Sequence, residues 1–330
     1  MDVTELLARA ATAGASDLHL AAGEPPMLRL DGDLQRMDLP PSSCACMRDG
    51  LTNWLDEVQQ HQWIHGDELD IAITLPSLGR FRLNLFRQRA GLAASFRLLP
   101  VQVPSLESLH LTEVFRPVAQ WRDGLVLVGG PTGSGKSSTL AALVDWLNRE
   151  RPLHIITLED PVEIIHPSRQ ALINQREVGR HSRDFAHGLR SALRQDPDVI
   201  MIGELRDLET VRLALQAAET GHLVLATVHT RSAVNSIDRL VDVFAAEEKP
   251  LVRSMLAESL RMVVAQVLVK RTGGGRVAAR EVLVATPAVR NLIREGRTAQ
   301  LHSAMQSGTA DGMQTMEGAL RALRARGVLD

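Results

Sequence analysis

The chain contains no tyrosine, and aromatic residues make up only 3% of its 330 residues. Proteins that bind single-stranded nucleic acid stack bases on aromatic side chains, so few platforms for such contacts exist here. Positive charge is not in excess either, because the formal net charge is −2 and no long Lys/Arg tract occurs. Both features argue against a nucleic-acid partner.

Long hydrophobic runs are also missing. The longest nearly apolar runs, such as Met262–Val269, fall short of the roughly 20 residues that a membrane-spanning helix needs. No N-terminal stretch has the basic start and apolar centre of a signal peptide, so we expect a cytoplasmic protein. The two cysteines, Cys44 and Cys46, form neither a zinc motif nor a disulfide framework, and we expect free thiols.

The length and an apolar content of 45% are typical of a soluble protein with about two domains. We expect residues 1–100 to form a small α+β domain. Asp31-Gly32-Asp33 is a tight-turn signal between two short apolar runs and predicts a β-hairpin. Helices are expected at Glu5–Ala13 and Met47–Val58, and strands at Leu28–Leu30, Leu34–Met37, Leu69–Leu75, Arg80–Arg87 and Leu92–Leu99.

Two arginines fall on the polar side of these strands. Side chains alternate between the two faces of a sheet, so Arg82 lies opposite Phe81 and Leu83. By the same rule Arg97 lies opposite Phe96. We therefore expect a polar sheet face that carries Arg82 and Arg97.

A different pattern follows the proline-bounded stretch Pro100–Pro104, and we expect residues 101–116 to link two domains. In residues 117–330, apolar strands alternate with amphipathic helices, which predicts an α/β fold with a mostly parallel sheet. The expected strands are Leu125–Val128, His154–Leu158, Val199–Ile202 and Leu223–Val228, followed by strands around Gly273–Gly275 and C-terminal helices within residues 286–330.

The most specific motif lies directly after the first of these strands. It fits G-x-x-x-x-G-K-[ST] in full and opens a helix, which is the context of a phosphate-binding P-loop. Its glycines let backbone N–H groups surround phosphate oxygens at a helix N-terminus. Lys136 is expected to bridge the β- and γ-phosphates of ATP, and Ser137 to hold Mg²⁺. The expected nucleotide contacts are Gly130, Pro131, Thr132, Gly133, Ser134, Gly135, Lys136, Ser137 and Ser138.

Acidic residues occur where two of the parallel strands end. Ligands bind beyond the carboxyl ends of such strands, so Glu204 is favoured over Asp198 as the second Mg²⁺ ligand. Glu159, Asp160 and Glu163 follow strand His154–Leu158. We expect Glu163, one turn into the segment that begins at Asp160, to be the general base, and the alternative role of Asp160 is to cap a helix. Glu159 and Asp160 support it.

Two histidines bracket the last parallel strand. His229 stands at the carboxyl end and is expected to sense the γ-phosphate, whereas His222, seven residues earlier, has a weaker supporting role or caps and packs.

Phosphoryl transfer also favours a cation near the γ-phosphate, which a neighbouring subunit often supplies. The candidates are Arg82, Arg97, Arg190, Arg194, Arg206 and Arg239.

In combination these residues resemble the ATPases of type II and type IV secretion systems, and among them the type IV pilus retraction (PilT) family. The resemblance covers nearly the whole chain. It rests on the stretches Ala15–Leu20, Gly79–Asn84, the P-loop, LEDPVE at Leu158–Glu163 (Asp box), Asp196–Asp207 (Walker B), Thr220–Thr230 (His box) and AVRNLIRE at Ala288–Glu295, where Val289 replaces the Ile of a motif linked to retraction.

The resemblance implies a small N-terminal α+β (PAS-like) domain followed by a RecA-like P-loop ATPase domain with a helical C-terminal part. It also implies a homohexamer at the inner membrane that docks on a platform protein, acts indirectly on pilin, and uses Arg82 and Arg97 of neighbouring subunits. The tetracysteine zinc element of assembly ATPases is absent, which favours retraction.

Other functions stay open at this stage. A paralogue could act on a different client. A RecA-like motor that moves nucleic acid would show ATP turnover stimulated by DNA. A nucleotide-switched binding module would bind ATP without turnover.

Overall fold

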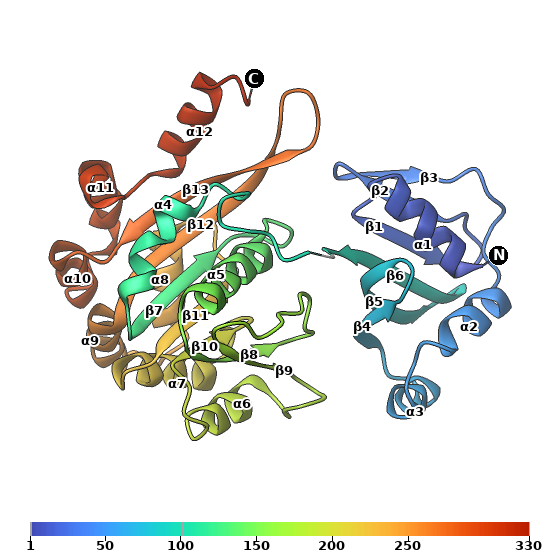
Figure 1. The fold of residues 1–330 in the computed structure, drawn as a ribbon, viewed down its shortest axis with the longest axis horizontal. Coiled ribbons are helices and arrows are strands. Elements are labelled where there is room, and N and C mark those ends of the chain that lie inside the picture. Colours follow the sequence, from blue (N-terminus) through green and yellow to red (C-terminus); the bar gives the residue numbers. More distant parts are fainter. Residues whose placement is uncertain (1, 101, 330) are drawn as a thin grey trace. The chain divides into compact units, whose positions relative to one another are not determined.

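The computed structural model describes residues 2–100 and 102–329, and for Cys46 it describes the backbone alone. The chain forms two compact units, Met1–Gln102 and Val103–Asp330 (Figure 1). Val101, the first residue of the expected linker, and the Cys46 thiol lie outside the described part. Residues 103–116, most of the expected linker, belong to the second unit, and Leu106, Leu111 and Phe115 are completely buried in its core.

The first unit is an antiparallel sheet covered by helices on one face. Its strand order is β3-β2-β1-β6-β5-β4. Inward-facing residues such as Leu18, Phe81 and Phe96 pack against Leu6 and Leu7 of the first helix. The elements are α1 (Val3–Thr12), β1 (Asp17–Ala21), β2 (Met27–Leu30), β3 (Asp33–Arg36), α2 (Cys44–Thr52), α3 (Glu57–His65), β4 (Leu69–Leu75), β5 (Gly79–Gln88) and β6 (Gly91–Leu99).

The predicted hairpin is confirmed, whereas one predicted helix is wrong in extent. Asp31 and Gly32 both have positive φ, 48° and 98°, as a two-residue hairpin turn requires. The helix expected at Met47–Val58 is instead divided between α2 and α3. Asp56 starts the second helix because its carboxylate accepts a hydrogen bond from the Gln59 N–H at 2.9 Å, and the Gln59 side-chain oxygen accepts one from the Asp56 N–H at 3.1 Å.

The second unit contains a seven-stranded sheet in the order β13-β12-β7-β11-β10-β8-β9. All neighbours are parallel except the pair of β12 and β13, which confirms the predicted α/β class. The strands are β7 (Gly124–Gly129), β8 (His154–Glu159), β9 (Leu172–Glu177), β10 (Val199–Ile202), β11 (Leu223–Val228), β12 (Leu260–Lys270) and β13 (Arg276–Val284).

Helices cover both faces of this sheet. Alternate residues of β7 point to different cores: Val126 and Val128 pack with Leu143, whereas Leu125 and Leu127 pack with Leu215. The helices are α4 (Thr112–Phe115), α5 (Lys136–Glu150), α6 (Phe185–Ala192), α7 (Leu208–Glu219), α8 (Ala233–Asp242), α9 (Lys249–Ser259), α10 (Pro287–Arg294), α11 (Leu301–Ser307) and α12 (Met316–Ala325), with short 3-10 turns at η1 (Arg116–Gln120), η2 (Thr298–Gln300) and η3 (Thr309–Asp311).

The segment after β8 excludes the alternative role of Asp160 as a helix cap. The peptide bond between Asp160 and Pro161 is cis, and no helix begins there, so Asp160 caps none and Glu163 does not lie on one. Residues 160–171 instead form an irregular loop that leads to β9, a strand that the sequence did not reveal.

Within the described residues, no helix combines the length and the apolar character that crossing a bilayer requires.

Candidate active site

The P-loop takes the curled shape that its glycines permit. Gly130, Gly133 and Gly135 have φ values of 155°, 76° and 89°. A Cβ atom at Gly130 would lie 2.5 Å from the Gln266 carbonyl oxygen, so no larger residue fits at this turn. Ser137 is the second residue of α5, where free N–H groups and the helix dipole favour an anion.

The Lys136 side chain lies buried against its own loop. Its ammonium group donates to the carbonyl oxygens of Gly130 at 2.8 Å and Pro131 at 3.1 Å. Burial lowers the pKa of Lys136, and the carboxylates of Glu204 and Glu163 oppose that shift. Glu163 and Glu204 therefore lie near enough to the P-loop for their charges to act on Lys136.

A buried glutamine of β12, which the sequence did not single out, fastens the P-loop. The Gln266 amide donates to the Ser134 carbonyl at 2.7 Å, and its oxygen accepts from the Thr139 hydroxyl at 2.9 Å. One side chain thus connects the loop to the first turns of α5. Gln266 is 130 residues from Lys136 in a mainly apolar strand, and its position in that strand was the only signal for it.

Glu204 follows the carboxyl end of β10, as predicted from the direction of the strand. Its carboxylate pairs with Arg206 at 2.6 Å and lies 3.3 Å from the Nε2 atom of His229. The backbone around it is fixed, because the Gly203 N–H donates to the Leu158 carbonyl at 2.7 Å. Glu204 and His229 therefore meet where β10 and β11 end.

The two histidines of the His box occupy opposite ends of β11. Burial and then the charge of Lys136 lower the pKa of His229, whereas Glu204 raises it. The Nδ1 atom of His222 lies 3.1 Å from the Ala217 carbonyl, at the end of α7. This geometry favours the capping role for His222 over a role at the P-loop.

The carboxylates after β8 have different surroundings. Glu159 is only 9% exposed and accepts hydrogen bonds from the Thr157 hydroxyl at 2.7 Å and from Gln175 at 3.1 Å. Burial raises the pKa of Glu159, although hydrogen bonds that include one from the Glu163 N–H oppose this. Glu159 therefore supports the loop through these buried hydrogen bonds. Glu163 is the carboxylate of this segment whose charge acts on Lys136.

The candidate arginines are distributed over both units. Arg82 and Arg97 are cross-strand partners in the first unit, which confirms their shared face. Arg82 pairs with Asp70 at 2.7 Å, and Arg97 pairs with the buried Asp17 at 2.9 Å.

In the second unit, Arg206 pairs with Glu204 and Arg190 pairs with Glu209. Arg194 and Arg239 are exposed. Arg194 precedes β10 and so lies toward the amino end of the parallel strands, away from Lys136.

The donors that face the P-loop fit Mg²⁺. A hydroxyl at Ser137 and a carboxylate at Glu204 are hard oxygen ligands, and Mg²⁺ usually takes one or two of these together with phosphate oxygens. No group of three or more His, Cys, Asp or Glu side chains that could hold a metal ion occurs in the described part of the chain. Ser137 and Glu204 would therefore leave the other ligand positions of a Mg²⁺ ion to nucleotide phosphates and water.

The chain is similar to known proteins over nearly its whole length. The family model described as type II/IV secretion system protein matches residues 2–325. The chain belongs to this family. The type IV pilus retraction ATPase PilT of Pseudomonas aeruginosa is 53% identical over 329 residues, which cover 100% of this chain and 96% of that protein.

Further members of the type II/IV secretion family are similar over most of their length. A twitching motility protein of Neisseria gonorrhoeae is 50% identical over 92% of this chain and 82% of its own. The crystal structure of the pilus retraction motor PilT with bound ADP has a TM-score of 0.89 and 41% identity, and it covers 100% of this chain and 95% of that one. The expected family and fold are confirmed.

Proposed function

We propose that the protein is an ATP-hydrolysing motor that powers retraction of type IV pili. The observation that carries this proposal is that four groups meet at the carboxyl end of the parallel strands. The first group is the P-loop with Lys136, and the others are Glu163, Glu204 and His229. Similarity to PilT supports the client, because the names of two relatives refer to pilus retraction and to twitching motility.

Each group has a distinct part in the proposed reaction. The N–H groups of the P-loop and the Lys136 ammonium bind the β- and γ-phosphates of ATP. Ser137 and Glu204 would hold Mg²⁺, which would neutralise charge on the phosphate oxygens. Glu163 accepts a proton from the water whose oxygen bonds to the γ-phosphorus, the bond between that phosphorus and the bridging oxygen of the β-phosphate breaks, and ADP and phosphate leave. His229, whose lowered pKa favours the neutral ring, contacts the γ-phosphate and relays its presence to Glu204.

The proposed partners follow from the family. The protein would act as a homohexamer at the cytoplasmic face of the inner membrane, docked on the pilus platform protein and acting indirectly on pilin. Arg82 and Arg97 would serve the site of a neighbouring subunit. Their ion pairs with Asp70 and Asp17 hold both guanidinium groups on one sheet face, which suits them for a shared contact.

The test is steady-state ATP hydrolysis at increasing protein concentration by the unaltered protein and by Glu163→Gln, with Lys136→Ala as the control for background phosphatase. Specific activity that rises with concentration supports a site completed between subunits. A substantial rate that does not change with concentration would remove the shared arginines from the proposal. Hydrolysis by Glu163→Gln at the unaltered rate would show that Glu163 is not the base.

A further inference from the structure

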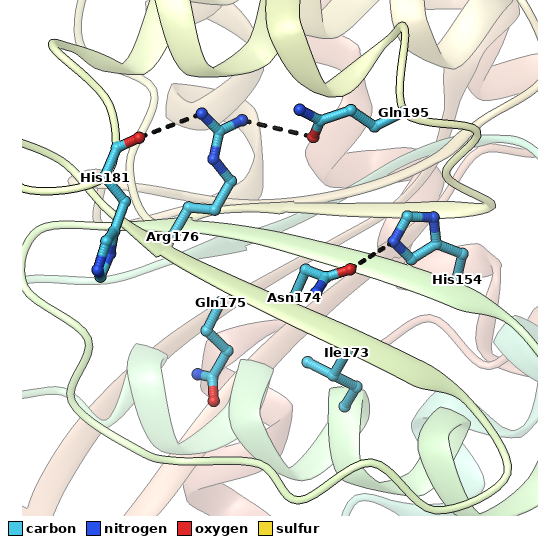
Figure 2. A pocket seen from close by; sticks show the side chains of 7 residues that line it. All are labelled: His154, Ile173, Asn174, Gln175, Arg176, His181 and Gln195. Atoms are coloured by element: carbon cyan, nitrogen blue, oxygen red, sulfur yellow. Dashed lines mark hydrogen bonds between the residues drawn. The ribbon is translucent and has the colours of Figure 1, made fainter.

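The loop that carries Glu163 is held by the neighbouring edge strand β9. This strand runs parallel to β8, with Gln175 opposite Thr157 and Glu177 opposite Glu159. Gln175 and Glu177 point to the same face of the sheet, because they are two residues apart. Figure 2 shows Gln175 on the opposite side of β9 from Arg176, so the two side chains point to opposite faces of the sheet.

The Gln175 amide makes three hydrogen bonds to the region around Glu163. Its nitrogen donates to the Ile164 carbonyl at 2.8 Å and to the Glu159 carboxylate at 3.1 Å. Its oxygen accepts from the His166 N–H at 2.8 Å. Ile164 and His166 are 5% and 6% exposed, so water is a poor substitute for these bonds.

Glu163 is thereby fixed from both sides. The residue before it, Val162, donates its N–H to the Glu177 carboxylate at 3.0 Å. The residue after it, Ile164, is held by Gln175. The N–H of Glu163 itself bonds to the Glu159 carboxylate, which Gln175 also contacts. No helix or strand fixes residues 160–171, so these side chains determine the path of the loop.

We infer that Gln175 is a positioning residue for ATP hydrolysis, which sets the place of the Glu163 carboxylate without touching nucleotide. This inference rests on the proposed role of Glu163 as the general base. A displacement of about 1 Å in a catalytic group costs up to roughly 100-fold in rate. Nucleotide affinity depends on the P-loop, which Gln266 fastens independently on β12.

Gln175→Ala and Gln175→Met test the inference together with a matched control. The methionine variant keeps length and apolar packing but loses the hydrogen bonds, so it serves if the alanine variant does not fold. Asn174→Ala is the control, because Asn174 is the adjacent amide and contacts His154 instead of the loop. We expect kcat to fall roughly 10- to 100-fold in the Gln175 variants. The ADP dissociation constant should stay within about twofold, and Asn174→Ala should hydrolyse ATP at the unaltered rate.

The double variant Gln175→Met with Glu163→Gln shows whether the two residues act as a unit. If Gln175 acts through Glu163, the double variant is no slower than Glu163→Gln alone. A further multiplicative loss would overturn the inference, as would unchanged kcat in Gln175→Met, or a loss of ADP affinity equal to the loss in rate. Full activity of Glu163→Gln, by contrast, contradicts the proposed base. The kcat of the Gln175 variants would then show by itself whether Gln175 affects hydrolysis.

Hydrogen exchange provides a readout that does not depend on turnover. The His166 amide should exchange faster in Gln175→Met, while amides of α5 keep their protection. Unchanged exchange at His166 would show that Gln175 does not hold the loop.

Discussion

Lys136 is a buried charged side chain that the backbone of its own loop stabilises. Its ammonium group bonds two loop carbonyls, and we propose that it exchanges these for phosphate oxygens when nucleotide binds. Hydrogen bonds that involve a charged group contribute about 1.5–3 kcal/mol. We therefore expect Lys136→Ala to weaken ADP binding by roughly 10- to 100-fold, measured with a fluorescent ADP analogue.

Lys249→Ala is the control for this substitution. Lys249 pairs with Asp242 on the surface and should leave ADP affinity unchanged. Equal affinities of the Lys136→Ala and unaltered proteins would contradict the assignment of the P-loop.

His166 gives the fold a pH dependence with a definite sign. Burial lowers the pKa of His166 from its ordinary value of 6.5, and Asp145 only partly opposes this. The unfolded chain then binds more protons than the native one as the pH falls below 6.5, so acid destabilises the native state. The pKa values of His19 and His229 are lowered as well and add in the same direction.

We expect the urea midpoint of unfolding to fall between pH 7.5 and pH 5.5, values chosen as about one unit either side of an ordinary histidine pKa. The fall should be smaller in His166→Phe, which removes one of the titrating rings. An identical fall in both proteins would mean that other groups dominate.

Sequence motifs predicted the residues expected to bind phosphate and metal but not the side chains that hold those residues in place. Lys136 and Glu204 could be predicted because chemistry restricts the residue type and its distance from a strand end. Gln266 and Gln175 could not, since a glutamine in a strand has no spacing rule and its partners are distant along the chain. Hydrogen-bond geometry, which only the folded structure provides, distinguishes them from other polar residues.

At the scale of elements, the P-loop depends on β12 as much as on β7 and α5. Gln266 is 1% exposed, so its loss leaves the Ser134 carbonyl and the Thr139 hydroxyl buried without that partner. We expect Gln266→Leu to weaken ADP binding about tenfold through a less ordered loop, measured by calorimetric titration.

Gln314→Ala is the matched control, because Gln314 bonds the Arg280 carbonyl on the neighbouring strand and does not contact the loop. Unaltered ADP affinity in Gln266→Leu would show that the loop keeps its shape without the hydrogen bonds of Gln266.

Apolar periodicity predicted most elements and failed where polar residues form them. The strongly patterned helix α10 follows the cap residue Thr286 and buries Val289 and Ile293 completely. Strand β9 reads Leu-Ile-Asn-Gln-Arg-Glu, which has no apolar run, and it was missed. β9 lies at the edge of the sheet and pairs with β8 alone. Most of its side chains are therefore at least partly exposed, which suits polar residues.

At the scale of the whole molecule, the proposed ring needs arginines from one subunit at the site of another. Arg97→Ala and Glu163→Gln damage different components, so in mixed rings some interfaces combine an intact Arg97 with an intact Glu163. We expect mixtures of the two variants to regain part of the ATPase rate, measured after subunit exchange that native mass spectrometry confirms. No recovery despite exchange would assign Arg97 a role within its own subunit or in folding.

The strand order of the second unit also determines when the site can appear during synthesis. The P-loop strand β7 lies between β11 and β12, both of which are made much later. A ribosome thus releases the complete G-x-x-x-x-G-K-S motif long before its two neighbouring strands and before Gln266. Until then the growing chain contains the P-loop sequence without the strands that hold the loop in its folded shape. We therefore expect nucleotide to stabilise the nascent domain only after β12 has emerged.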